Sequence, residues 1–396
     1  MSIQLTSKYA KDQPYHQYYD LDCINNATNG TTAPVQLQFN DIRNSPYVNC
    51  PENYFMSLVR FYVESSSLPV MIPAVELGQN DPNKLVYSVS MRYVGVSNTV
   101  YTQQTFLTYV SSDTTIPVAS APLIQQDTST SYYYVYTYQE WIKMINTALA
   151  TCIAALNASV IAAANGDVLP TTNAPFMIID PNAFTTTMNA DITGFNNTLA
   201  RPIELYFNTA LYSLYNNYQW TSYGNSASIG GRNYKMQIYN NNAQNSMTIS
   251  ALYTVLVMFQ EQPTVALLNP VSSVVFTTGQ LPVVPSLLSN PVLFNSTTSN
   301  ISSGNNSNVS PIISDFEVPF SALDTFKPNI SYGAAGEYRL IDLYGNSPLN
   351  AIQITVSWKD YYGNIRPLYL LADCAANLKI MFRRKDFGSV DLGIQQ

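Results

Sequence analysis

Hydrophobic and polar residues alternate with a period of two along much of this 396-residue chain, which is the pattern of half-buried β-strands. Segments 35–39 and 54–72 show it, although Ser65, Ser66, Ser67 and Pro69 interrupt the second. The longest example is the segment 84–96, which places five residues on one face: Leu85, Tyr87, Val89, Met91 and Tyr93. These segments predict β-strands.

One segment, residues 137–164, has the 3.6-residue period of a helix instead. Thr137 followed three residues later by Glu140 predicts a capping box at its start. The apolar stripe predicts a face packed in the core, and it consists of Trp141, Met144, Ile145, Ala148, Cys152 and Leu156. A second segment, 203–218, fits either a helix or a strand.

The last third of the chain is a series of short strand patterns with turn signals about every ten residues, which is typical of a sandwich or barrel. These strands are expected at 311–318, 336–343, 349–358, 366–371 and 377–384. The fold class is therefore mainly β and antiparallel.

The helix and the loose pattern around it interrupt two β-rich regions, which predicts an inserted domain. We expect one domain from residues 34–97 and 251–396, and an inserted β-rich domain with one or two helices from residues 98–250. Residues 1–33 are polar and tyrosine-rich, and we expect them to form an extended N-terminal arm. Residues 286–310 are rich in Asn, Ser and Thr and are expected to be an exposed loop.

The segment 354–370, ITVSWKDYYGNIRPLYL, contains the densest polar group inside a strand pattern. Its centre, Lys359 to Asn364, is either a small polar site or a turn between two strands. The alternation on both sides favours a hairpin, with Gly363 and Asn364 supplying the positive φ angles of a tight turn. The Lys359–Asp360 pair is then a contact at the rim of the domain.

The amino-acid composition indicates the chemical character of the protein surface. Only 11% of residues are charged, against about 25% in ordinary soluble domains, while 30 residues are tyrosine. A surface poor in charge and rich in tyrosine suits burial against other protein. The net charge of −7 argues against specific nucleic-acid binding. The one dense basic run, Arg383-Arg384-Lys385, is a candidate for contacts between subunits, as are Lys359, Asp360 and Tyr361.

Residues for catalysis or metal binding are scarce. The single histidine, His16, excludes a histidine-based nucleophile system or metal site. Four widely separated cysteines form no zinc or redox motif, and no phosphate-binding glycine loop is present. A pair of carboxylates could still serve a glycosidase, but nothing selects a pair. We expect no enzyme activity, no catalytic residue, no cofactor and no metal.

Three segments carry a family resemblance. They are 54–73, 272–291, and the stretch from Pro311 to Phe387 that contains PIISDFEV, GEYRLIDL, WKDYYG and LKIMFRRKDF. These segments resemble the minor capsid, or penton, proteins of virophages and Polinton-like viruses, in the same order and spacing. One departure is Leu371-Ala372-Asp373-Cys374, which stands where the family has a turn with proline and glycine.

The resemblance implies a jelly-roll subunit of which five occupy each icosahedral vertex of a capsid. The implied partners are four further copies, hexamers of the major capsid protein and other minor capsid or cement proteins. Residues 98–250 would then project from the surface, where they could meet a host surface ligand. The implied location is the virion vertex, after synthesis in the host cytoplasm or a virus factory.

Two alternatives stay open from the residues alone. One is a double jelly-roll major capsid protein of a small double-stranded DNA virus, for which the chain is short. The other is a β-sandwich protein that binds or cleaves carbohydrate.

Overall fold

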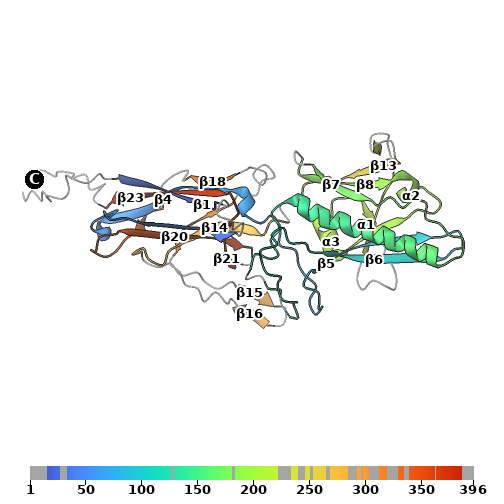
Figure 1. Ribbon diagram of the computed structural model, residues 1–396, viewed down its shortest axis with the longest axis horizontal. Helices are drawn as coiled ribbons and strands as arrows, with labels where there is room; N and C mark the ends of the chain where they lie inside the picture. The colour runs from blue at the N-terminus through green and yellow to red at the C-terminus, as the bar shows by residue number, and fades with distance from the viewer. Residues whose placement is uncertain are drawn as a thin grey trace, which may run out of the picture. The chain divides into compact units, whose positions relative to one another are not determined.

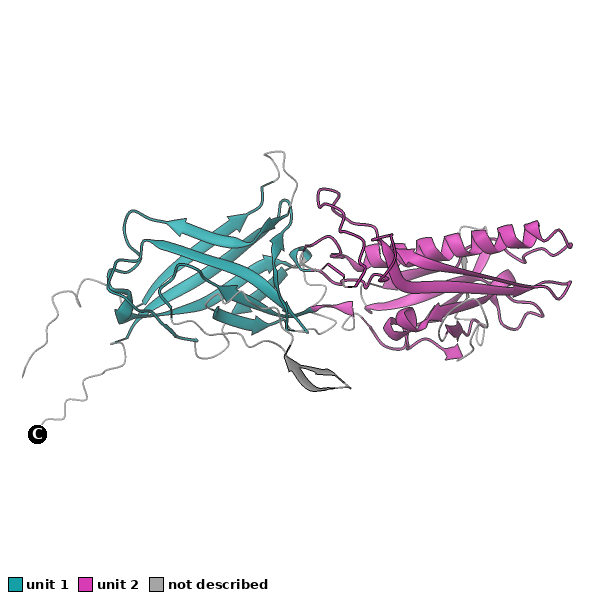
Figure 2. Cartoon of the chain, turned by 90° about the horizontal axis from the view of Figure 1, so that it is seen from below, with its two compact units in different colours: residues 1–68, 271–319, 327–396 teal, residues 69–270, 320–326 magenta. Residues whose placement is uncertain are grey.

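A computed structural model shows this chain as two compact units (Figure 2). Unit 1 comprises Met1–Leu68, Val271–Pro319 and Lys327–Gln396, and unit 2 comprises Pro69–Pro270 and Phe320–Phe326. The structure describes residues 16–26, 34–124, 126–127, 130–180, 183–221, 233–239, 246–249, 253–264, 268–283, 292–295, 298–302, 312–318, 329–333, 339–361 and 363–385.

Unit 1 is built from two antiparallel five-stranded sheets (Figure 1). The first sheet has the order β1 (His16–Ile24), β23 (Ala375–Arg384), β4 (Tyr54–Glu64) and β18 (Asn329–Gly333), with β19 (Ile341–Asp342) also on β4. The second has the order β17 (Ile312–Glu317), β14 (Val271–Thr277), β20 (Ala351–Asp360) and β21 (Ile365–Pro367), with β3 (Gln38–Ile42) also on β20.

Two short pairs complete the described strands of unit 1. β2 (Val35–Gln36) pairs with β22 (Tyr369–Leu370), and β15 (Val292–Asn295) pairs with β16 (Thr298–Ser302). The second pair lies within the segment 286–310, which was expected to be a loop, so that expectation was wrong for these residues. Two strands of polar sequence can still pair, because the hydrogen bonds between strands are made by backbone groups.

The two sheets pack face to face through aromatic side chains. The ring of Phe61 on β4 lies 5.0 Å from the ring of Phe276 on β14 and 5.9 Å from that of Phe316 on β17. All three side chains are buried, at 0%, 0% and 7% exposure. This edge-to-face packing joins the two inner faces and makes unit 1 a sandwich.

A bulge in β4 explains how one long strand keeps its apolar residues inside. Lys379 of β23 pairs with Arg60, whereas the next residue, Ile380, pairs with Leu58, so Val59 is the extra residue. Buried positions therefore change parity, with Leu58 before the bulge and Phe61 after it. The bulge lets both halves of the strand face the core.

The N-terminal residues 16–24 form the strand β1 and do not belong to a free arm. β1 pairs with β23 along its whole length, from His16 opposite Arg383 to Ile24 opposite Ala375. The sequence hid this strand because Leu21 is the one fully apolar side chain that β1 buries. Its stability comes from backbone pairing with a strand more than 350 residues away, which alternation alone does not reveal.

The described residues of unit 2 form two antiparallel sheets and three helices (Figure 1). One sheet has the order β10 (Trp220–Thr221), β11 (Asn233–Met236), β9 (Glu204–Asn208), β5 (Lys84–Val94), β6 (Val100–Thr108). The other has the order β12 (Ser246–Ile249), β13 (Tyr253–Phe259), β8 (Thr185–Asp191), β7 (Phe176–Asp180). The helices are α1 (Tyr138–Ala162), α2 (Ile192–Phe195) and α3 (Thr209–Leu214).

The helix α1 has the start and the buried face that its sequence predicts. The Glu140 amide donates to Thr137 Oγ1 over 3.2 Å, and the Thr137 amide donates to Glu140 Oε2 over 3.3 Å, which completes the capping box. All six residues of the predicted stripe are buried. They pack α1 against β5 and β6 of one sheet and β7 of the other, so the helix joins the two sheets.

The structure moves the expected domain limits. Residues 69–97, which include β5, lie in unit 2 instead of the sandwich, and so do residues 251–270, which include β13. Their alternation is that of any half-buried strand, and only their partners β9 and β8 assign them to unit 2. The ambiguous segment 203–218 is a strand followed by a helix, β9 then α3. With the short helix α2 at 192–195, the described part of unit 2 has three helices, one more than the one or two expected.

Asn146 on α1 closes part of an open sheet edge. β7 is the edge strand of its sheet, and the Asn146 side chain donates to the Met177 carbonyl over 2.9 Å and accepts from the Met177 amide over 2.7 Å. One side-chain amide thus replaces a neighbouring strand at this residue. Cover of this kind hinders pairing with another chain at this residue.

We predict that Asn146→Ala lowers the free energy of unfolding by about 1–3 kcal/mol, because two hydrogen bonds to the edge strand are lost. Asn157→Ala on the same helix is the matched control, since no described hydrogen bond of this half-buried side chain is removed, and it should change stability by less than about 0.5 kcal/mol. Chemical denaturation measures both. Equal effects of the two substitutions would contradict the assigned role of Asn146.

Candidate functional site

The polar segment after Trp358 is the hairpin that its sequence predicts. Ser357, Trp358 and Lys359 of β20 pair with residues of β21, and the Gly363 amide donates to the Asp360 carbonyl over 3.0 Å. Gly363 has the expected positive φ of 83°. The φ angle of Asn364 is not positive, so that part of the expectation was wrong.

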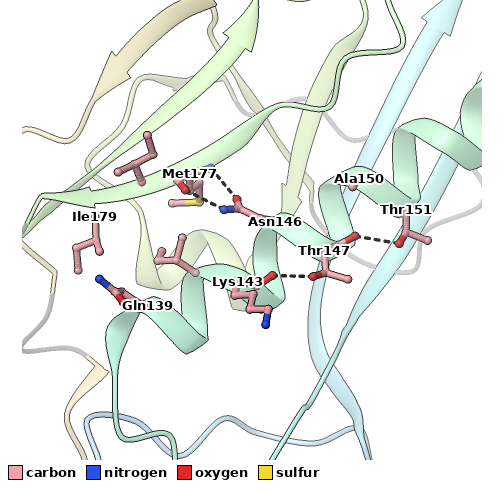
Figure 3. A pocket seen from close by; sticks show the side chains of 10 residues that line it. Gln139, Lys143, Asn146, Thr147, Ala150, Thr151, Met177 and Ile179 are labelled. Atoms are coloured by element: carbon pink, nitrogen blue, oxygen red, sulfur yellow. Dashed lines mark hydrogen bonds between the residues drawn. The ribbon is translucent and has the colours of Figure 1, made fainter. Parts of the chain in front are cut away.

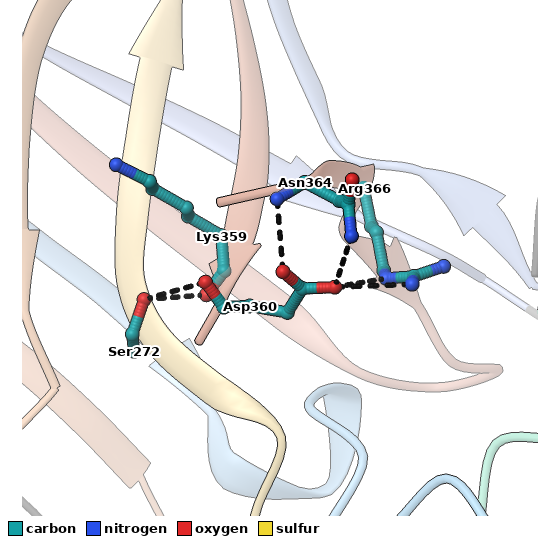
Figure 4. Close-up of polar contacts among 5 residues, drawn as sticks. All are labelled: Ser272, Lys359, Asp360, Asn364 and Arg366. Carbon is teal, nitrogen blue, oxygen red and sulfur yellow. Dashed lines mark hydrogen bonds and ion pairs between the residues drawn. The ribbon is translucent and has the colours of Figure 1, made fainter. Parts of the chain in front are cut away.

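The Asp360 carboxylate is the centre of this turn (Figure 4). It accepts from the Asn364 amide over 2.8 Å, from Asn364 Nδ2 over 3.0 Å, and from Arg366 Nε and Nη2 over 3.2 and 3.0 Å. The side chains of Arg366 and Asp360 are only 12% and 5% exposed. The guanidinium also lies over the Trp358 ring, 5.6 Å from its centroid. The result is a buried, hydrogen-bonded ion pair.

This geometry corrects the expectation of a Lys359–Asp360 contact at the rim. Asp360 pairs with Arg366 inside unit 1, because the two residues meet across the hairpin, whereas Lys359 projects from the opposite face of β20. Tyr361 is 60% exposed. Lys359 and Tyr361 therefore keep the expected position at the surface, and Asp360 does not.

The basic run follows the C-terminal strand β23. Arg383 and Arg384 are its last residues and are half-buried. Lys385 is held within unit 1, since its Nζ lies 2.9 Å from Asp342 Oδ1 and 5.2 Å from the centroid of the Phe55 ring. Because Arg383 pairs with His16, the start of β1 and the end of β23 lie at the same end of unit 1.

A cluster around Arg43, which the sequence analysis missed, fixes β1 to the rest of unit 1. The Arg43 guanidinium carbon lies 5.0 Å from the centroid of the Tyr19 ring on β1 and 4.7 Å from that of Tyr47. Arg43 Nε donates to Asp41 Oδ2 over 2.8 Å, and the Tyr47 hydroxyl donates to the same carboxylate. The hydrogen bonds from Tyr47 and Arg43 lower the pKa of Asp41. The sequence feature that could have revealed this cluster is the i, i+2 spacing of Asp41 and Arg43.

A groove of unit 2 lies between α1 and β7 and has a volume of about 580 Å³ (Figure 3). Amide and hydroxyl groups of α1 line one wall, and Met177, Ile178 and Ile179 line the other. Lys143 is its single charged lining residue. This set contains no nucleophile–base pair. Among the described residues, no three His, Cys, Asp or Glu side chains are grouped as metal ligands.

Comparison with known proteins gives these surfaces a context. Residues 17–384 match the family described as Sputnik minor capsid protein V18/19. The chain belongs to this family. It is 36% identical over 120 residues to the uncharacterized protein V18 of Sputnik virophage, covering 29% of this chain and 70% of V18. It is 24% identical over 209 residues to the structural protein V19 of the same virophage, covering 52% of this chain and 92% of V19.

Two solved structures share the fold. A chain in the 3.5 Å cryo-EM structure of the Sputnik virophage matches with a TM-score of 0.67 and 24% identity, covering 95% of this chain and 99% of that one. The crystal structure of the mavirus penton protein matches with a TM-score of 0.54 and 15% identity, covering 93% and 99%. The expected mainly β fold with a jelly-roll sandwich is confirmed.

Membership of this family identifies the chain as a structural protein of a viral capsid, and its location is the virion. This confirms the family resemblance and favours it over the carbohydrate-binding and major-capsid alternatives. A structural capsid family also agrees with the expectation of a non-enzymatic role.

We predict that Asp360→Ala lowers the free energy of unfolding by about 3–5 kcal/mol, because it leaves the Arg366 charge buried without its partner. The double substitution Asp360→Ala/Arg366→Met should recover much of this loss, since no unpaired charge remains. Lys359→Met is the control and should change stability by less than about 0.5 kcal/mol. Equal stability of the single and double variants would contradict the ion-pair assignment.

We predict that Arg43→Met loosens β1 by about 1–2 kcal/mol, because it removes two cation–π contacts and a hydrogen bond to Asp41. Hydrogen exchange of the β1 amides should accelerate by about tenfold or more, while that of β20 stays unchanged. Arg60→Met is the control, because its ion pair with Asp20 is half exposed. Uniform acceleration in all strands would show that Arg43 stabilises the whole unit instead.

Proposed function

We propose that this chain is a penton subunit, of which five copies close each fivefold vertex of the capsid. The observation that carries this proposal is the likeness over nearly the whole chain to a structure named as a penton protein, within a family of minor capsid proteins. Major capsid protein hexamers around the vertex are the proposed neighbours. Other minor capsid or cement proteins are further candidates.

The division of the chain into two units suits a subunit with two different roles. In this proposal, unit 1 is the base that contacts the capsid, and unit 2 projects from the vertex and can meet a host surface ligand. A fivefold ring needs two different patches on each copy, repeated until the ring closes. The low charge content of the chain favours such burial, because few charged groups must be desolvated.

The end of unit 1 where β1 begins and β23 ends is the proposed contact with neighbouring subunits or the capsid interior. Residues 1–15 precede β1 in the sequence, and residues 386–396 follow Lys385. Lys359 and Tyr361 are a second candidate contact. Asp360 is excluded from it, because its carboxylate is occupied by Arg366.

We predict that the purified chain, alone or mixed with its major capsid protein, forms a ring whose mass is five times that of one copy. Light scattering coupled to gel filtration measures this mass.

Deletion of residues 1–15 should lower incorporation into particles at least fivefold without changing the melting temperature, because those residues precede β1. Arg383→Gln/Arg384→Gln should act in the same direction, and Lys143→Gln on α1 is the control.

Two outcomes would contradict the proposal. One is a chain that stays monomeric under both conditions. The other is electron-microscopy density that places it at the hexamer positions instead of the vertices. Loss of soluble protein on deleting residues 1–15 would assign that segment to folding instead of assembly.

A further inference from the structure

The open edge of β7 leaves the backbone groups of Ile179 without a strand partner. Thr186 lies opposite Ile179 in the pairing of β7 with β8. The Thr186 amide, however, donates to Gln260 Oε1 over 2.7 Å, and the Thr186 carbonyl accepts from the Gln260 amide over 3.3 Å. Opposite residues in an antiparallel pair either exchange both backbone hydrogen bonds or direct both groups away from each other. The amide and carbonyl of Ile179 therefore point away from β8.

Met177 has the same orientation, which supports this assignment. Its amide and carbonyl are bound by the Asn146 side chain on α1, so they also point away from β8. Residues two apart in a strand, such as Met177 and Ile179, direct their backbone groups to the same edge. The hydrogen bonds of the described residues outside the ladder include none to the Ile179 backbone. Asn146 thus covers one residue of this edge and leaves the next open.

These open groups lie in the groove between α1 and β7 (Figure 3). The α1 wall of the groove runs from Gln139 to Thr151, which is about 18 Å of helix. Figure 3 shows Ile179 at the Gln139 end and Met177 farther along, at Asn146. An extended chain of about five residues has the same length. The groove is therefore long enough for a short strand laid beside β7.

β7 has the features of a strand that accepts a partner. Ile178 is 47% exposed and forms part of the apolar wall of the groove. Lys and Pro residues, which commonly protect a sheet edge, are absent from β7. Domains that bind extended peptides use such an edge, because backbone hydrogen bonds hold the added strand and neighbouring side chains select its sequence. The β7 edge can therefore bind the backbone of an extended peptide.

The groove has one charge, and that charge is positive. Lys143 is exposed and is the single charged residue of the lining. No described carboxylate forms an ion pair with it. Glu140, the neighbouring acidic residue on α1, accepts from the Thr137 amide. Asp180 of β7 accepts from the Ala183 amide over 3.4 Å. A carboxylate from a bound segment would neutralise Lys143.

The open backbone groups, the apolar wall and the single cation together select the partner. They match an extended peptide that carries an acidic residue among apolar ones. A carbohydrate would use an aromatic ring for stacking, and none lines the groove. A membrane surface would call for several Lys or Arg side chains, and the lining has one. Because Asn146 occupies Met177, an added strand can exchange backbone hydrogen bonds with Ile179 only.

We propose that the groove between α1 and β7 binds an extended acidic segment of another protein, which pairs with Ile179 and places a carboxylate beside Lys143. The contact is small, with one paired residue and one ion pair, so binding to a single groove is weak. In a ring of five, which is the proposed function above, a partner with several such segments would bind several grooves together and gain in strength.

Two fluorescent peptides and the full-length chain test the charge contact. The probes are Thr-Ile-Glu-Ile-Thr and Thr-Ile-Gln-Ile-Thr, each labelled with fluorescein at its N-terminus and amidated at its C-terminus, so that only the central residue differs. We expect at least fivefold tighter binding of the Glu peptide in fluorescence anisotropy at 50 mM NaCl, and a smaller difference at 0.5 M NaCl. Lys143→Gln should remove the difference between the peptides. Lys379→Gln in unit 1 is the control and should preserve it, since Lys379 pairs with Asp20 outside the groove.

Methylation of the peptide backbone tests the strand pairing. Each N-methyl group removes one N–H donor, and only the residue opposite Ile179 donates to β7. One methylated position should therefore weaken binding about tenfold, and its two neighbours less than twofold. Ala150→Trp, which fills the groove from the exposed surface of α1, should also weaken binding about tenfold with an unchanged melting temperature. Ala154→Trp is the matched control, because Ala154 is exposed one turn farther along α1 and outside the lining.

Equal binding of the Glu and Gln peptides would overturn the proposal, as would equal losses from Ala150→Trp and Ala154→Trp. Binding of sialyllactose that Ala150→Trp abolishes, without binding of either peptide, would assign the groove to a sugar and overturn it too. Lys143→Gln should leave incorporation into particles unchanged, because the bound segment belongs to a protein outside the ring. A chain that forms rings of five but binds neither peptide would keep the proposed function and overturn this proposal.

Discussion

The pairing of β23 with β1 and β4 is the interaction on which unit 1 depends. It joins the C-terminal strand to two strands near the N-terminus, over separations of more than 300 residues. Closing such a loop costs entropy that grows only with the logarithm of its length. Because unit 2 is a nearly continuous segment, from Pro69 to Pro270, it can fold on its own and shorten the effective loop.

This dependence explains what the sequence could and could not predict. Features set by neighbours in the chain were predictable: the capping box of Thr137 and Glu140, the buried stripe of α1, and the hairpin with Gly363. Features set by distant partners were not. β1 buries Leu21 alone among its fully apolar residues, and β5 has the same alternation as any strand of unit 1, so neither could be placed before its partners were known.

The turn at residues 371–374 is another feature that the local sequence could not predict. Its sequence lacks the proline and glycine of the related turns, yet the chain still turns there. Asp373 adopts a φ of 60°, which a short polar side chain tolerates, and its amide donates to the Asn25 carbonyl over 2.7 Å. A long-range hydrogen bond therefore fixes a turn that local sequence left open.

Several charges of this chain pair with one another inside its units. Asp360 is paired with Arg366, Asp41 with Arg43, and the Glu204 carboxylate receives both Arg92 and Lys235 at 2.8 and 2.6 Å. Each of these ion-pair groups links strands or turns and adds to the backbone hydrogen bonds that hold them. Open strand edges such as β7 also need cover, and Asn146 provides it at one residue, Met177. A capsid subunit must associate through chosen faces only, and cover of an edge strand by a side chain serves that requirement.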